Sequence, residues 1–281
     1  MKLTALVDNS RLANRTDLTV ERGLSLHMET MGQSILFDTG SSQAFCDNAK
    51  LLDISIEGVD AVVISHRHHD HCNGTAHFIV RNSKAQVYFK QCEDNEYCFK
   101  AFGFESNVGI EKSLFSKMSS RLTLVNGITE IRPNIFIVTD IKQRFAQPKG
   151  NKYLFTHSKH GYKPDRFDHE LMLVVKEEDG LIVFTGCAHS GVLNMVETAI
   201  GLFPNTRIKA VVGGFHLVGL PLFNSIGGTK AEIKQLAHTL LEYPIDKLYT
   251  GHCTGMKAYG ILKEVLGERL DHLPTGRSVV I

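Results

Sequence analysis

The sequence has little excess charge of either sign and no long apolar run. Its 31 Lys and Arg residues oppose 30 Asp and Glu residues over 281 positions, so the formal net charge is +1. A chain without a basic excess lacks the global positive field that holds nucleic acid, and we expect no nucleic-acid partner. A membrane span needs about 18 consecutive apolar residues, and none occurs, so no membrane partner is expected. A small-molecule substrate is the expected partner.

Several signals of location and catalysis are also absent. The N-terminal stretch MKLTALVDNSRLANRTD has too short an apolar part for a signal peptide. Without an export signal, the six cysteines are expected to be reduced thiols, and the cytoplasm is the expected location. The sequence contains no GxSxG elbow, no P-loop and no GxGxxG after a strand, so its chemistry does not rest on those motifs.

What the chain does contain is a set of short apolar runs that end in polar residues. Aliphatic runs of this length, bounded by Gly, Asp or Ser, are typical of buried strands. They occur in LTALVDN, SILFDTG, AVVISHRHHDH, LIVFTGCAHSG, IKAVVGGFHL and KLYTGHCTG. Helical spacing follows Ser190, a candidate N-cap, and follows Thr229, and the segment GMKAYGILKEVLGERL is also helix-like. The pattern predicts an α/β fold with a site on loops at strand ends.

Residues 65–74, SHRHHDHCNG, place four histidines and one aspartate within six positions, directly after an apolar run. Clustered imidazoles repel when protonated and need partners when buried, and a divalent cation removes both problems. His66 and His68 alternate along the chain and are expected to face one ion, whereas Asp70 and His71 follow a turn and would face a second ion. Zinc is the expected metal, with iron or manganese as alternatives. A solvated histidine-rich loop is the competing interpretation.

The pattern H-x-H-x-D-H after an apolar strand resembles the motif of metallo-β-lactamase-fold hydrolases. Its residues here are His66, His68, Asp70 and His71. Further segments resemble one branch, labelled metal-dependent hydrolases similar to 7,8-dihydropterin-6-methyl-4-(β-D-ribofuranosyl)aminobenzene-5′-phosphate synthase. These segments are VDN, GLSL, FDTG, TGCAHSGVLN, GGFHL and GHCTG. The resemblance implies an αββα sandwich of two mixed β-sheets flanked by helices. It also implies one domain over residues 1–281, in which we interpret 92–170 as an insertion or lid.

The resemblance implies further metal ligands. The last histidine of the superfamily corresponds to His252 in YTGHCTG. Cys187 stands where the superfamily has a bridging aspartate, and the Gly-Cys-x-His pattern is the form expected in the branch. His189 is then the third ligand of the ion at His66 and His68. Cys187 either bridges the ions as a thiolate or is a small buried residue behind the loop.

Three other residues are expected near the site. Asp38, in FDTG, corresponds to an aspartate that orients a ligand histidine. His216 follows a strand and two glycines, and we expect it to contact substrate or transfer a proton, with a core histidine as the alternative. Thr254 lies in a turn that exposes backbone N–H groups and is expected to contact a substrate phosphate or carboxylate.

The predicted function is metal-dependent hydrolysis of a small ester, lactone or phosphodiester by a metal-bound hydroxide at two divalent ions. Asp70 would orient the hydroxide and carry a proton to the leaving group. One alternative is a transferase similar to the pterin-pathway synthase for which the branch is named. Another is a non-catalytic sensor of a metal or a ligand on the same fold.

Overall fold

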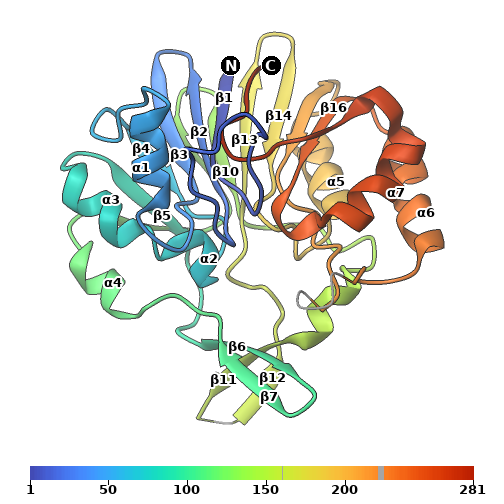
Figure 1. Cartoon of the computed structure of the whole chain (residues 1–281), viewed down its shortest axis with the longest axis horizontal. Coiled ribbons are helices and arrows are strands. Elements are labelled where there is room, and N and C mark those ends of the chain that lie inside the picture. Colours follow the sequence, from blue (N-terminus) through green and yellow to red (C-terminus); the bar gives the residue numbers. More distant parts are fainter. Residues whose placement is uncertain (160, 221–224) are drawn as a thin grey trace. The chain divides into compact units, whose positions relative to one another are not determined.

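The structure is a computed structural model that describes residues 1–159, 161–220 and 225–281 (Figure 1). These residues form two compact units. The first comprises Met1–Val125, Thr156–Lys163 and Leu273–Ile281, and the second comprises Asn126–Phe155 and Pro164–His272. The organisation of 1–281 as one domain stays a prediction.

A seven-stranded mixed sheet forms the framework of the first unit. In spatial order its strands are β18 (Ser278–Val280), β1 (Lys2–Val7), β2 (Ser25–Thr30), β3 (Gln33–Phe37), β4 (Ala61–Val63), β5 (Gln86–Lys90) and β8 (Leu122–Val125). The pairs from β3 to β8 are parallel. Phe37 pairs with Val63, so the residues after β3 and β4 leave the sheet side by side.

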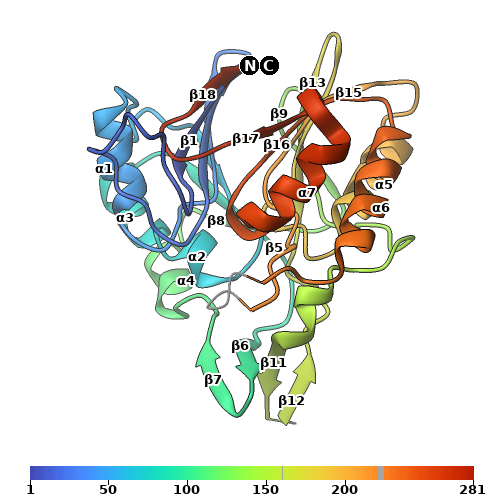
Figure 2. The same ribbon diagram turned by 45° about the vertical axis from the view of Figure 1, so that its right-hand side comes forward.

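Helices cover this sheet and bury its apolar side chains. They are α1 (Ala44–Leu51), α2 (His69–Cys72), α3 (Thr75–Arg81) and α4 (Ser113–Lys117). Phe45 of α1 and Phe78 of α3 are fully buried against strand residues such as Val62 and Val87, and both helices lie along the sheet in Figures 1 and 2. Burial of each such side chain contributes about 1.5–3 kcal/mol.

The second unit has its own seven-stranded mixed sheet. In spatial order its strands are β17 (Leu270–His272), β16 (Ile245–Thr250), β15 (Ile208–Val212), β14 (Gly180–Phe184), β13 (Met172–Glu177), β10 (Ile135–Val138) and β9 (Ile128–Arg132). Strands β14 to β17 are parallel. Their carboxyl ends therefore meet at one edge, which is where open α/β sheets bind ligands.

Three helices pack on the second sheet: α5 (Val192–Leu202), α6 (Lys230–Leu241) and α7 (Met256–Leu266) (Figure 2). Thr229 begins α6 with a capping box to Glu232, as its position predicts. The predicted N-cap of α5 is wrong by one residue. Gly191 occupies that position with φ 94°, a backbone conformation that glycine adopts readily, and Ser190 donates its backbone N–H to Glu170. Short 3₁₀ turns are η1 (Lys149–Tyr153), η3 (His252–Thr254) and η4 (Gly267–Arg269).

Residues 92–170, apart from residue 160, which lies outside the described residues, add strands to several sheets. A third sheet, absent from the sequence-based expectation, has the order β12 (Gly161–Pro164), β11 (Leu154–Ser158), β6 (Glu96–Ala101) and β7 (Phe104–Asn107). The same region supplies β8, β9 and β10. It is thus built into the framework of the protein, and its role as a lid stays a prediction.

The predicted fold class is confirmed. All six apolar runs form strands, namely β1, β3, β4, β14, β15 and β16, and all three predicted helices form. Each unit carries a mixed sheet with helices, as the αββα class requires. Among the described residues, no helix is both long enough and apolar enough to cross a membrane.

Asn194 is the buried polar residue that fixes the loop before η1 to helix α5. Its Oδ1 accepts the backbone N–H groups of Arg144 and Phe145, at 2.8 and 2.7 Å. Its Nδ2 donates to the carbonyls of Phe145 and Ser190, at 2.9 and 2.7 Å. The side chain therefore satisfies backbone groups that would otherwise lose their partners.

We predict that Asn194→Ala lowers the free energy of unfolding by about 3 kcal/mol, because it leaves buried backbone groups unsatisfied. Urea denaturation followed by circular dichroism measures the change. Gln235→Ala, at an exposed position of α6, is the control and should shift the free energy by less than about 0.5 kcal/mol. Equal effects of the two substitutions would contradict the anchoring role.

Candidate metal centre

Asp38 organises the histidine cluster of the first unit. It follows β3 directly, beside the segment that follows β4, and it is fully buried. Its Oδ1 accepts the backbone N–H of Ser65 at 2.7 Å, and its Oδ2 accepts the Ser65 hydroxyl at 2.7 Å. Oδ2 also lies 2.7 Å from Nδ1 of His71. The predicted position of Asp38 beside a candidate ligand histidine is therefore observed.

Three imidazoles gather above this carboxylate. The ring centroid of His66 lies 4.6 Å from that of His68 and 4.2 Å from that of His71, and all three residues are buried. Nδ1 of His66 is 2.8 Å from the Ser65 hydroxyl. Since Nδ1 is engaged in both His66 and His71, a metal would bind each ring through Nε2. Such a set of imidazoles fits a zinc ion.

Residues 108–110 hold the loop that carries these histidines. The His69 N–H donates to the carbonyl of Val108 at 2.8 Å, and the Ile110 N–H donates to the carbonyl of Arg67 at 2.9 Å. His68 and Gly109 form an antiparallel bridge between these bonds. This part of the region 92–170 therefore positions the cluster.

Asp70 lies on α2, between the candidate ligands His68 and His71 in the sequence. Its side chain is 11% exposed, and its Oδ2 lies 3.7 Å from Nε of Arg22, a side chain that is 65% exposed. The exposed guanidinium gives a weak, screened ion pair. Asp70 is thus a slightly exposed carboxylate on α2 with an exposed cation beside it.

The second unit brings together a different set of candidate ligands. The turns after β14 and β15 carry Cys187, His189 and His216, whose ligand atoms lie within 4.8 Å of one another. The His189 and His216 rings are 4.1 Å apart, and Phe167 stacks parallel to His189 at 4.4 Å. The predicted neighbours Cys187 and His189 therefore share one site with His216.

Asn151 fixes the orientation of His189. Its Nδ2 donates to the carbonyl of His189 at 2.8 Å, and this bond fixes the orientation of the side-chain amide. Its Oδ1 lies 3.0 Å from Nδ1 of the His189 ring. An amide oxygen accepts only, so the ring carries its proton on Nδ1 and presents Nε2 as the donor to a metal. Sequence reasoning missed Asn151, which comes from η1.

Glu170 holds the backbone of the same turn. Its two carboxylate oxygens accept the N–H groups of His189 and Ser190, each at 2.7 Å. Complete burial raises the pKa of Glu170, and the bonds from Ser190 and His189 oppose that rise. The Glu170 carboxylate thus fixes the backbone at His189, the residue whose side chain is the candidate ligand.

His252 and Cys253 follow β16 in the turn η3, and with Cys187 they form a second group of ligand atoms within 4.8 Å. Burial by itself would raise the pKa of the Cys253 thiol. A hydrogen bond from Cys187 and the nearby His252 and His216 instead hold that pKa well below its usual value. Sequence reasoning missed Cys253, although it stands next to a predicted ligand.

Thr254 has a supporting position. It is buried, its hydroxyl oxygen accepts the Phe215 N–H at 2.9 Å, and it lies 2.6 Å from the Thr250 hydroxyl. These bonds tie the turns after β15 and β16 together. The arrangement favours a structural role over the predicted substrate contact.

Backbone strain gathers at both ligand sets. Asp38, Ala188, His216 and His252 all have positive φ, at 60°, 55°, 47° and 47°. This region is sparsely populated by residues other than glycine, and each case costs on the order of 1–3 kcal/mol. Strain that persists in such residues is typical of functional sites.

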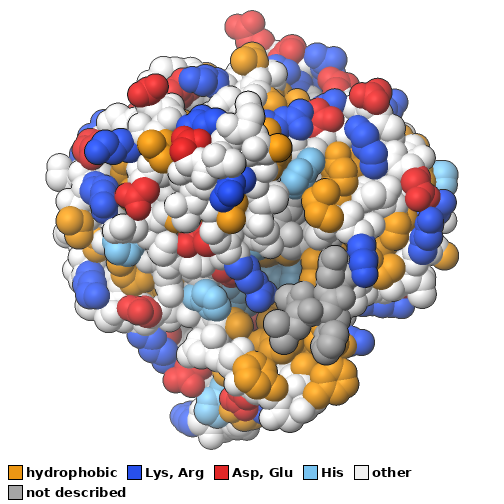
Figure 3. Space-filling view, in the orientation of Figure 1, with side chains coloured by type: hydrophobic (Ala, Val, Ile, Leu, Met, Phe, Trp, Pro, Cys, Tyr) orange, Lys and Arg blue, Asp and Glu red, His pale blue; other side chains and the backbone are white. Residues whose placement is uncertain are grey.

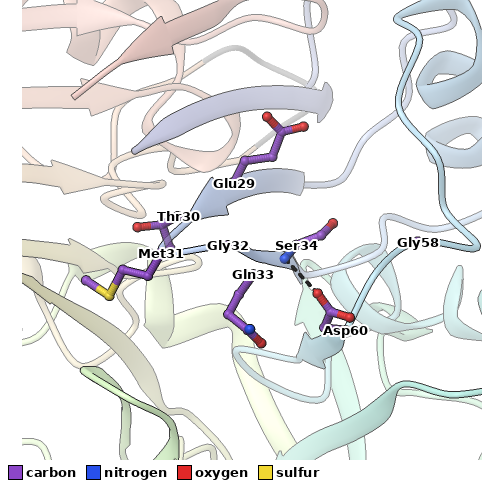
Figure 4. A pocket seen from close by; sticks show the side chains of 8 residues that line it. All are labelled: Glu29, Thr30, Met31, Gly32, Gln33, Ser34, Gly58 and Asp60. Atoms are coloured by element: carbon purple, nitrogen blue, oxygen red, sulfur yellow. Dashed lines mark hydrogen bonds between the residues drawn. The ribbon is translucent and has the colours of Figure 1, made fainter.

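An open pocket of about 500 Å³ lies in the first unit and is lined by none of the candidate ligand residues (Figure 4). It lies at the turn between β2 and β3, at the end of β3 opposite to Asp38, and no histidine or cysteine lines it. Figure 3 shows acidic and basic side chains interspersed on the visible face. Neither feature competes with the histidine and cysteine clusters as a site for chemistry.

We predict that Asn151→Ala shifts the His189 proton from Nδ1 toward Nε2, because the ring loses its acceptor. Nitrogen-15 NMR of the imidazoles in the metal-free protein measures the tautomer. Metal affinity should fall about 10- to 100-fold, as for other residues that orient a ligand. Asn151→Asp loses the bond from Nδ2 to the His189 carbonyl but keeps an acceptor for Nδ1, so it is the control in which the tautomer should stay unchanged. An unchanged tautomer in Asn151→Ala would contradict this assignment.

Comparisons with known proteins cover the candidate ligand residues. The family model described as the metallo-beta-lactamase superfamily matches residues 18–91, which include Asp38 and the histidine cluster. The chain is 28% identical, over 273 residues, to the 7,8-dihydropterin-6-methyl-4-(β-D-ribofuranosyl)-aminobenzene-5′-phosphate synthase of Methanocaldococcus jannaschii. That alignment covers 92% of this chain and 90% of the synthase.

Solved structures extend the likeness to the whole chain. The structure titled Tm1679, a metal-dependent hydrolase of the beta-lactamase superfamily, is 27% identical, with a TM-score of 0.81 over 100% of this chain and 99% of that one. Zinc-bound PqqB from Methylobacterium extorquens is 9% identical, with a TM-score of 0.59 over 100% of both chains, and shows the fold alone. The predicted resemblance is confirmed: part of the chain matches the family model of the metallo-beta-lactamase superfamily, and the whole chain is similar in fold to a metal-dependent hydrolase of that superfamily.

Proposed function

We propose that the protein is a metal-dependent hydrolase of a small ester, lactone or phosphodiester. The observation that carries the proposal is the cluster of His66, His68 and His71, two of whose rings are oriented by Ser65 and Asp38. Desolvated, oriented imidazoles beside a buried carboxylate are costly unless they bind a cation. The likeness to a metal-dependent hydrolase over the whole chain supports the same activity.

The proposed ligands are His66, His68, Asp70, His71, His189 and His252. When bound, a divalent metal lowers the pKa of a water molecule and polarises the electrophile of the substrate. The chain's own part is to orient the ligands. Asp38 and Ser65 set the rings of the first unit, and Asn151 sets His189.

Asp70 is the proposed proton carrier. Its carboxylate is slightly exposed on α2, between two proposed ligand histidines in the sequence, and a partly exposed carboxylate of this kind suits proton transfer. His216, half-buried against His189, is the proposed substrate contact.

A second candidate function is the synthase reaction of the Methanocaldococcus jannaschii relative. It is favoured by a likeness that spans 92% of this chain. The fold supports more than one reaction, so the resemblance by itself does not distinguish between the two candidate functions. The two candidates differ in product, because a synthase would form the named pterin compound, whereas a hydrolase would release an alcohol and an acid.

We predict that untagged protein binds about two equivalents of zinc, iron or manganese per chain, as two-metal hydrolytic sites do. His66→Ala and His252→Ala should each lower that content, because each removes a proposed ligand. Plasma emission spectroscopy measures the metals. His238→Ala, at an exposed position of α6, is the control and should leave the content unchanged.

Protein that contains no metal after growth in several metal supplements would overturn the hydrolase proposal. Metal lost equally from His238→Ala would show that the loss reflects general instability of the histidine variants.

We predict that Asp70→Asn lowers kcat for a chromogenic phosphodiester or lactone about 10²- to 10⁴-fold, because an amide cannot carry the proton. Steady-state kinetics measure the loss, and metal analysis of the same sample separates it from metal depletion. Asp17→Asn removes an exposed carboxylate of the same unit and should leave kcat unchanged. Full activity of metal-loaded Asp70→Asn would exclude this role.

A further inference from the structure

Two cysteines of the second unit meet at the carboxyl ends of neighbouring parallel strands. Cys187 lies in the turn after β14, and Cys253 lies in the turn after β16, with β15 between them. The ligand atoms of Cys187, His252 and Cys253 lie within 4.8 Å of one another. Sγ of Cys253 also lies 3.6 Å from the carbonyl oxygen of Cys187. Both sulfurs and one imidazole therefore converge on one point.

Gly214, at the end of β15, permits this approach. A Cβ placed on Gly214 would lie 2.3 Å from Sγ of Cys253 and 3.6 Å from Cα of Cys187. The first distance is far below van der Waals contact, so any side chain there would displace the sulfur. The backbone between the two turns is thus shaped to hold the sulfur of Cys253 close to Cys187.

The separation of the donor atoms suits a metal ion. Around a tetrahedral zinc with Zn–S bonds of about 2.3 Å and Zn–N bonds of about 2.0 Å, the ligand atoms lie roughly 3.4 to 3.8 Å apart. Small side-chain rotations bring atoms within 4.8 Å to that spacing. Three protein ligands would leave a fourth position open, as in catalytic zinc sites. His216 also lies close to Cys187.

We propose that Cys187, Cys253 and His252 form a thiolate-rich site for zinc in the second unit. Cys253 is then a metal ligand that the H-x-H-x-D-H motif and its partner histidines do not include. The inference rests on the metal centre of the proposed function, in which His252 is a ligand, but it does not require hydrolysis. It makes one of the two metal positions sulfur-coordinated.

Cobalt substitution tests the proposal, since cobalt bound to thiolate has a near-ultraviolet charge-transfer band and cobalt bound only to nitrogen and oxygen does not. The full chain is purified under reducing conditions, stripped with a chelator and titrated with Co²⁺. We expect the band in the wild-type protein, about half of it in Cys187→Ser and in Cys253→Ser, and none in the double variant. Cys92→Ser, at a half-buried cysteine of the first unit, should keep the full band.

Gly214→Ala provides a test that keeps every thiol. Its methyl group should displace the sulfur of Cys253 and lower the band to about that of Cys253→Ser. Circular dichroism of the same sample shows whether the variant is folded. A full band in folded Gly214→Ala would remove Cys253 from the ligand set.

The double variant His66→Ala/His68→Ala separates this site from hydrolysis. We expect the thiolate band to persist there although activity is lost. Hydrolysis without any thiolate band in the wild-type protein would overturn this inference and leave the proposed function standing. A mass two hydrogens lower, with Cys187 and Cys253 joined in a peptide map of protein that takes up no cobalt, would identify the pair as a disulfide and likewise overturn the inference.

Discussion

One buried carboxylate in each unit fixes the loop that carries the candidate ligands. A carboxylate removed from water costs several kcal/mol unless hydrogen bonds replace its hydration. Asp38 obtains them from Ser65 and His71, and Glu170 obtains them from the backbone of His189 and Ser190. The donors belong to the ligand loops themselves. The charge is therefore stabilised only when those loops take the conformation that presents the imidazoles.

The parallel strands decide which residues these carboxylates can reach. Asp38 and Ser65 meet because β3 and β4 are parallel and in register, and the turns after β14, β15 and β16 meet for the same reason. Tight turns at these ends force positive φ on Asp38, His216 and His252. That strain is offset by the surrounding hydrogen bonds and packing, which hold these residues in the observed conformation.

Local pattern predicted the strands and the histidine motif, because apolar runs and the spacing H-x-H-x-D-H are both contained within a few residues. Contacts between residues far apart in the sequence could not be predicted from such local patterns. Asn151 lies 38 positions from His189, and nothing in its neighbourhood in the sequence marks it as a partner. Cys253 stands next to a predicted ligand in the sequence but was not itself predicted. Nothing in the sequence around Gly214 indicates that its missing side chain leaves room for the sulfur of Cys253. Thr254 was expected to contact a substrate phosphate or carboxylate, but it is buried and its hydroxyl joins two turns.

The donor atoms also bear on which metal the protein selects. Imidazoles and a carboxylate in the first unit accept zinc, iron or manganese with little preference beyond the general order of affinity. Thiolates are soft donors that favour zinc over manganese. A sulfur-coordinated position in the second unit would therefore discriminate between metals that the motif of the first unit does not separate. In this protein, the choice of metal would then depend on Cys187 and Cys253 more than on the histidine cluster that first identifies the family.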